Sequence, residues 1–223
     1  AQFAGADDPT TREARIRLQR VLDSMKPYSY FDPSTVPRPN PTDVWKESRF
    51  QDQGGFVVVE AEQLPIPRDE SWCPEAVVTG YRGLGYLRAL RDQLDQPDRG
   101  ATRVGAIIDN AGPWHVAVRV RSDHPFVDDR SFWFKVGQGD WIKASLPEQT
   151  QPGAWTWVDP LEARASPDGQ ATITLRERGN DFSIAPGDAN VKIDRIVIYQ
   201  DDQKARALDP ETPLSEFHQW ASP

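Results

Sequence analysis

The sequence predicts an all-β protein, a β-sandwich preceded by an N-terminal helix and a proline-rich arm. From about residue 55 onward, apolar residues recur at every second position, which is typical of half-buried strands. The 223 residues include 20 Pro and 15 Gly, which favour turns over a mainly helical fold. A chain of this length is also long enough for one large domain with extensions.

The predicted strands are short and are separated by Gly, Pro and Asp turns. The clearest alternation runs from 114 to 120, with Trp or Val at every even position. Further strands are expected at 56–60, 132–136, 171–175 and 193–199. Because no strong helical pattern interrupts them, this series of short strands favours a sandwich of two sheets.

Residues 1–53 are predicted to form a helix and then an extended arm. Thr10 and Glu13 have the spacing of a capping box, and apolar residues follow at helical intervals, so we expect a helix over about 11–25. Four prolines between 33 and 41 predict an irregular arm, either linking to another module or packing on the main domain. Residues 203–223 are predicted to form an irregular tail.

Charge and composition exclude several classes of protein. The net charge is −8, and an acidic body repels phosphate backbones, so we expect no nucleic acid partner. No apolar run approaches the roughly 18 residues of a membrane span. Cys73 is the only cysteine, which excludes an internal disulfide and a cysteine-based zinc site. The chain begins with Ala1 rather than Met, which we interpret as removal of a signal peptide and hence a secreted, periplasmic or cell-surface location.

Five short sequence strings occur in order along residues 54–200. They are VEAE (59–62), GYRGLGYL (80–87), GPWHVAVR (112–119), WTW (155–157) and IDRI (193–196). Taken together they resemble carbohydrate-binding modules of families 6 and 35. The resemblance implies a galactose-binding-like jelly roll over residues 54–202 that binds a polysaccharide or oligosaccharide without catalysis. Two stretches, 90–102 and 179–191, are longer than is usual in these families.

A pair of glutamates predicts a metal site. On a strand, Glu60 and Glu62 share one face about 6.5–7 Å apart. Two carboxylates at that spacing repel each other unless a cation joins them, and calcium accepts six to eight oxygens in loose geometry. The resemblance implies Glu60, Glu62 and Asp194 as ligands of a structural Ca²⁺, with backbone carbonyls from the 80–85 turn completing the shell. The alternative is that one glutamate pairs with an arginine such as Arg82 or Arg195.

The resemblance also implies a sugar site, in which Tyr86 and Trp155 flank one sugar and Asn190 bonds its hydroxyls. Each residue has an alternative role, since Tyr86 can pack in the interior and Asn190 can shape a turn. Trp155 and Trp157 share one face of a strand, so at least one of them belongs in the core. We predict that Trp155 is exposed and Trp157 buried, with Trp72 and Trp141 as reserve platforms.

Two other classes of function stay open. A jelly-roll lyase or glycosidase is one alternative, because the string from 132 to 137 faintly resembles a lyase strand that carries Lys and Gly. However, the Gln-x-His and Arg-x-Glu-x-Arg strings are absent, and no serine has a nucleophile-elbow setting, so we assign no catalytic residue. A structural or adhesion spacer is the other alternative. In the resembled families, a module of this kind holds an associated glycan-degrading enzyme near its polymer.

Overall fold

The computed structural model describes residues 48–66, 71–92, 97–126, 130–161 and 171–219. The chain divides into two compact units, Ala1–Pro41 and Thr42–Pro223, and every described residue belongs to the second. The predicted N-terminal helix, and the proline-rich arm as far as residue 47, lie outside the described residues. Within the described part of the chain, no helix is long and apolar enough to span a bilayer.

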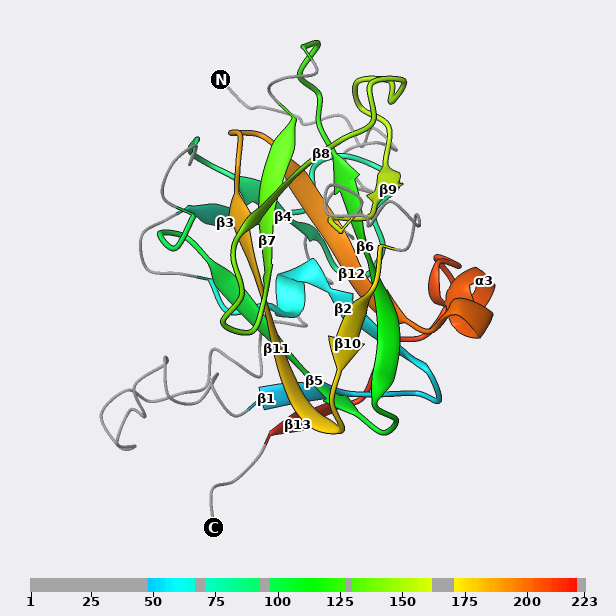
Figure 1. The fold of residues 1–223 in the computed structure, drawn as a ribbon. Coiled ribbons are helices and arrows are strands. Elements are labelled where there is room, and N and C mark those ends of the chain that lie inside the picture. The colour runs from blue at the N-terminus through cyan, green and yellow to red at the C-terminus, as the bar shows by residue number, and fades with distance from the viewer. Residues whose placement is uncertain (1–47, 67–70, 93–96, 127–129, 162–170, 220–223) are drawn as a thin grey trace, which may run out of the picture. The chain divides into compact units, whose positions relative to one another are not determined.

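The described strands form two sheets packed as a β-sandwich (Figure 1). The first sheet has the strand order β13 (Phe217–Gln219), β1 (Ser48–Gln51), β5 (Thr102–Ile108), β11 (Arg178–Pro186), β7 (Ser131–Val136) and β8 (Ile142–Ser145). The second has the order β10 (Ile173–Leu175), β6 (Gly112–Arg121), β12 (Lys192–Tyr199), β4 (Tyr86–Ala89) and β3 (Trp72–Glu75), with β2 (Phe56–Glu60) paired to β12 and β9 (Thr156–Val158) to β6. The predicted all-β sandwich is confirmed.

The core lies between the two sheets and is built by the alternation seen in the sequence. Trp114, Val116, Val118 and Val120 of β6 are all buried and belong to one apolar cluster. From the first sheet, phenylalanines of β7 and β11 enter the same cluster; one such pair stacks with ring centroids 6.1 Å apart. Period-two patterning therefore identified the strands whose inner faces are apolar and whose outer faces are polar.

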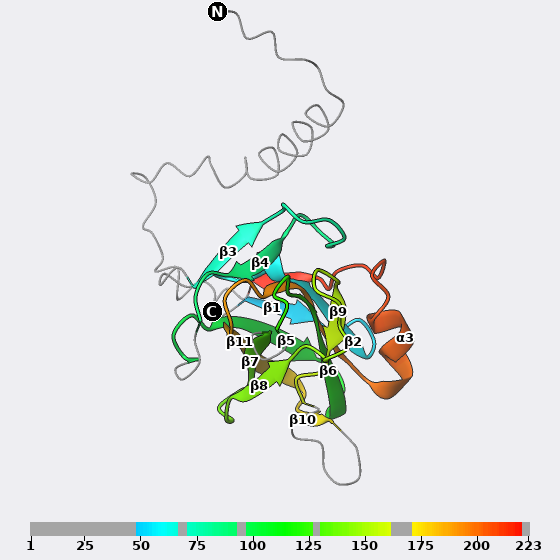
Figure 2. The same cartoon turned by 90° about the horizontal axis from the view of Figure 1, so that it is seen from above.

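The C-terminal segment corrects the prediction of an irregular tail. After β12 come a short 3-10 turn, η4 (Asp201–Gln203), a helix, α3 (Lys204–Ala207), and the edge strand β13. Figures 1 and 2 both show α3 on the flank of the sandwich, beside β2. Residues of α3, β2, β6 and β12 form a second apolar cluster: Phe56, Val58, Ala117, Val197, Tyr199 and Ala207. Elements of three or four residues are too short to show a period, so the sequence pattern did not identify them.

The tail explains why β2 and β12 are buried at every position. Their inner faces meet the core, and the C-terminal segment covers the apolar part of their outer faces. Ser215 fastens that segment to β2: its N–H donates to the Val58 carbonyl at 3.0 Å, and its Oγ accepts from the Val58 N–H at 3.0 Å. The sandwich thus extends beyond the predicted 54–202, from β1 at one end to β13 at the other.

Substituting Ser215→Ala is expected to lower the free energy of unfolding by about 1–3 kcal/mol, because the buried N–H of Val58 loses its acceptor. Chemical denaturation measures the change. The matched control is Ser145→Ala on β8, an exposed serine whose loss is expected to cost less than about 0.5 kcal/mol. Equal losses for the two variants would contradict the role given to the tail.

Candidate functional site

The loop of the β3–β4 hairpin, residues 76–85, contacts most of the predicted site residues, and Figure 2 shows this hairpin at one edge of the sandwich. Gly83 lets this loop approach two glutamates closely. Its φ is +65°, and a Cβ at that position would lie 2.3 Å from Glu62 Oε1 and 3.0 Å from Glu60 Cδ. Only glycine combines that backbone conformation with that contact. The loop therefore packs directly against the glutamate pair.

Three carboxylates meet beneath the loop. Glu60 ends β2, and Asp194 lies at an irregularity in the β6–β12 pairing. Glu62 is not on the strand as predicted, because the chain turns after Glu60 into the 3-10 helix η1 (Ala61–Gln63). Glu62 nevertheless stays close to Glu60, since both line the space under Gly83. The two glutamates are therefore neighbours because of a turn and not because of strand geometry.

The loop offers amide donors to these carboxylates. The N–H of Arg82 donates to Asp194 Oδ1 at 2.8 Å, and the N–H of Leu84 donates to Glu62 Oε1 at 2.7 Å. The sequence resemblance implied carbonyl oxygens of the same turn as metal ligands. In the structure these two contacts come from N–H groups, which stabilise negative charge on the carboxylates directly.

Two arginines balance part of the charge. The Nε of Arg195 donates to Glu60 Oε1 at 3.1 Å, with a second contact from its terminal nitrogen to the same oxygen. Arg119 forms an ion pair with Asp194 Oδ2. The alternative interpretation, in which a glutamate pairs with an arginine, is thus confirmed for Glu60.

The cluster holds more carboxyl groups than paired guanidinium groups. Three carboxylates face two guanidinium groups, and burial raises the pKa of Glu60 and of Asp194 above their ordinary values. Burial and the neighbouring carboxylates also raise the pKa of Glu62 to about 7. Among the described residues, no group bonds the buried Oε2 atoms of Glu60 and Glu62. Two buried carboxylate oxygens are therefore available to a cation.

The donor set suits calcium in its chemistry but is not preassembled. Carboxylate oxygens are the ligands that Ca²⁺ prefers, and the two unbonded oxygens belong to neighbouring glutamates. Both oxygens of Asp194, the third predicted ligand, are already engaged by Arg82 and Arg119. Across the residues that the structure describes, no three His, Cys, Asp or Glu side chains are arranged as a ready metal site.

Tyr86 lies under the loop and is fully buried. Its hydroxyl accepts from the Val78 N–H at 3.3 Å and donates to Glu75 Oε2 at 3.2 Å. Its ring meets Tyr81 and Trp155 edge to face, with centroids 5.6 and 5.7 Å apart. A fully buried ring has no open face for a sugar, which corrects the direct role expected for Tyr86. Its packing supports the two rings above it.

Trp155 and Tyr81 are both half-buried and reach the surface. The indole Nε1 of Trp155 donates to the Thr79 carbonyl at 3.0 Å, so the ring is held on the hairpin loop. Trp157 is also half-buried and packs on the second apolar cluster, so the prediction of an exposed Trp155 and a buried Trp157 is wrong. Tyr81 was not singled out from the sequence, although an aromatic residue beside a turn glycine is a recognisable signal.

Asn190 is exposed and sits in a turn with a φ of +66°, so the turn-forming alternative applies to it. Its Oδ1 accepts from Arg88 at 3.2 Å, and Arg88 Nε donates to Glu75 Oε1 at 2.7 Å. Because Glu75 also bonds the Tyr86 hydroxyl, a continuous row of polar groups joins Asn190 to the aromatic residues.

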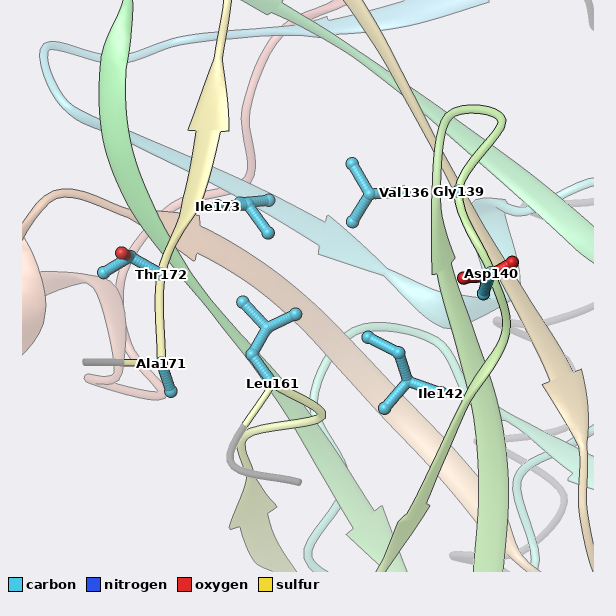
Figure 3. Close-up of a pocket in the computed structure, with 8 residues that line it drawn as sticks. All are labelled: Val136, Gly139, Asp140, Ile142, Leu161, Ala171, Thr172 and Ile173. Atoms are coloured by element: carbon cyan, nitrogen blue, oxygen red, sulfur yellow. The ribbon is translucent and has the colours of Figure 1, made fainter. Parts of the chain in front are cut away.

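A pocket of about 330 Å³ opens elsewhere in the structure (Figure 3). The view shows side chains from the β7–β8 hairpin facing Leu161 and β10 across it. The lining is mixed polar and apolar, and among the described residues that line it Asp140 is the only ionisable side chain. None of the predicted site residues lines it. Residues 162–170, which join two of its walls, lie outside the described residues, so we assign no site to this pocket.

Comparison with known proteins bears on the fold. No protein-family profile matches the sequence, and no curated protein matches it significantly. Among solved structures, a GH26-CBM35 β-(1,4)-mannanase from Podospora anserina matches with a TM-score of 0.50 and 16% identity, over 66% of this chain and 28% of that one. The chain thus spans little more than a quarter of that enzyme.

Two further matches are single modules. A family 35 carbohydrate-binding module from Clostridium thermocellum has a TM-score of 0.49 and 14% identity, over 66% of this chain and 99% of that one. The CBM35 of Cellvibrio japonicus Abf62 has a TM-score of 0.48 and 14% identity, over 65% and 93% of the two chains. At 16% identity, the match to the Podospora anserina structure speaks for the fold alone, a two-sheet β-sandwich.

The raised pKa of Glu62 predicts how stability depends on pH in metal-free protein. The folded state holds the proton more tightly than the unfolded state, so this contribution is complete below pH 4.5 and is lost as the pH rises through about 7. Glu62→Gln mimics the protonated form. In EDTA, its melting temperature relative to the unmodified protein is expected to rise between pH 5 and pH 8.

Thermal melts at the two pH values measure this difference, and Glu148→Gln, at an exposed glutamate, is the control. A Glu62→Gln difference that is the same at both pH values would show that burial does not hold the proton on Glu62.

Proposed function

We propose that this chain is a non-catalytic carbohydrate-binding module that binds polysaccharide at the loop of the β3–β4 hairpin. The observation that carries the proposal is the pair of half-buried rings, Trp155 and Tyr81, held on that loop beside a row of polar groups. A sugar presents apolar C–H faces and a rim of hydroxyls. Aromatic planes suit the first, and the side chains of Arg88 and Asn190 suit the second.

The fold supports this proposal. The Podospora anserina structure is named for a CBM35 as well as for its mannanase, and the match covers about the length of one module. Binding of this kind is weak at each site, because hydroxyls must give up water before they pair with protein groups. It becomes useful when the module holds an attached enzyme near a polymer, so a glycan-degrading enzyme is the partner we propose. Because its proposed ligand is a polysaccharide, we also propose that this chain is exported from the cell.

Calcium is the cofactor that we propose for the carboxylate cluster. Glu60 and Glu62 would hold it through their unbonded Oε2 atoms, and Asp194 would add negative charge beside them. Two arginines pair with only two of the three carboxylates, and bound calcium would supply the further positive charge. Both glutamates contact the hairpin loop at Gly83, so a cation there would stabilise the loop that carries the rings.

Substituting Trp155→Ala is expected to abolish the retardation of the protein in gels that contain a plant or algal polysaccharide, because the ring held on the hairpin loop is lost. Affinity electrophoresis measures the effect. Trp141→Ala is the matched control: Trp141 is also half-buried, and its indole also donates a hydrogen bond, to Asp98 at 3.0 Å.

Trp141→Ala should be retarded like the unmodified protein. Retardation that survives Trp155→Ala, or that is lost with Trp141→Ala, would place the sugar elsewhere. If no polysaccharide retards the unmodified protein, the result would contradict the binding proposal and favour the structural or adhesion spacer.

Removing calcium is expected to lower the melting temperature, and adding millimolar Ca²⁺ should restore it, because a ligand that binds only the folded state stabilises it. Calorimetry measures the shift. Glu62→Gln should show no response to either treatment. Mg²⁺ serves as a second control, since it demands tighter octahedral geometry. A melt unchanged by EDTA and by Ca²⁺ would contradict the calcium proposal.

A further inference from the structure

One side chain connects the carboxylate cluster to the exposed ring. Arg119 lies on the outer face of β6, and its side chain is 14% exposed. One terminal nitrogen forms the ion pair with Asp194, whose side chain is fully buried. The other terminal nitrogen donates to the Gly80 carbonyl at 2.9 Å. The guanidinium is therefore fixed at two points, one beneath the hairpin loop and one within it.

The same guanidinium lies against Trp155. Its central carbon is 5.5 Å from the centroid of the indole ring, within the range of a cation–π contact. The planar group can hold Asp194, Gly80 and the ring at once because its donors form a rigid fork. Lysine carries the same charge at a single point and cannot make all three contacts.

The backbone at Gly80 also lies close to the indole ring of Trp155. Gly80 has a φ of +85°, and a Cβ there would lie 3.2 Å from Trp155 Cδ1. The neighbouring Thr79 carbonyl accepts the indole N–H. The edge of the indole thus rests on residues 79–80, and Arg119 holds both that segment and the ring.

We infer that Arg119 is a positioning residue for the saccharide surface: by bridging Asp194 and the Gly80 carbonyl, it fixes the orientation of the Trp155 ring. This inference rests on the proposed function for its consequence, which is tighter sugar binding. The structural effect is independent of the proposed function, because Arg119 fixes the ring whether or not a sugar is present. Nor does it require a bound metal ion.

The test uses the full chain labelled with 5-fluorotryptophan. The ¹⁹F resonance of Trp155 is assigned by its disappearance in Trp155→Phe. Arg119→Met alone would leave the buried Asp194 carboxylate unpaired and could prevent folding. The decisive variant is therefore Arg119→Met combined with Asp194→Asn, which removes the ion pair and leaves neither of its charges buried without a partner. Arg119→Lys is the second variant, because it keeps the charge that pairs with Asp194.

In both variants the Trp155 resonance is expected to shift or broaden while the resonances of distant tryptophans stay in place. Affinity for the retarding polysaccharide is expected to fall about tenfold. The control is Arg49→Met, which breaks the 2.7 Å ion pair of a partly buried arginine with Asp181 on the first sheet and should change neither quantity.

An unchanged Trp155 resonance together with unchanged affinity in the double variant would overturn the inference. If the unmodified protein binds no polysaccharide, the proposed function fails by itself. The ¹⁹F resonance then still decides whether Arg119 fixes the ring.

Discussion

The buried ion pairs on the outer face of the second sheet fix the position of the hairpin loop and of the aromatic rings that pack on it. Glu60 and Asp194 are each paired with an arginine, and Glu62 accepts a backbone N–H from the hairpin loop. A buried charge is tolerated only when it is paired and hydrogen-bonded, so the loop and both arginines are held where the carboxylates need them. The C-terminal segment completes the enclosure, because the Thr212 carbonyl accepts from Arg195 and Glu211 pairs with Arg82.

This arrangement connects two features that would otherwise be separate, an acidic cluster and an aromatic surface. In the hairpin loop, the N–H groups of Arg82 and Leu84 donate to the carboxylates. The Thr79 carbonyl of the same loop accepts the indole N–H of Trp155. Tyr86, the first residue of β4, packs its ring against Trp155, and its hydroxyl donates to Glu75 on the neighbouring strand β3. A change in charge beneath the loop therefore reaches the rings through short and mostly rigid contacts, which gives the cation proposal a consequence for binding.

The sequence predicted the sheets better than the site. The alternation through Trp114 and its neighbours identified buried strands because inner and outer faces differ in polarity. The same pattern could not show that the outer face of β2 is also buried, since Ala207 and its neighbours cover it from far along the chain. Spacing put Glu60 and Glu62 on one strand, whereas a 3-10 turn separates them. Tyr86 was expected at the surface, and only the packing of Tyr81 and Trp155 over it shows that it is buried.

The central claim is that this sandwich binds saccharides at the hairpin loop above a charge cluster that a divalent cation completes. A glycan array probed with the full chain, once in calcium and once in EDTA, tests that claim most directly. The protein is expected to bind a limited set of polysaccharide fragments in calcium and to bind the same set more weakly in EDTA. An array on which no glycan is bound under either condition would contradict it.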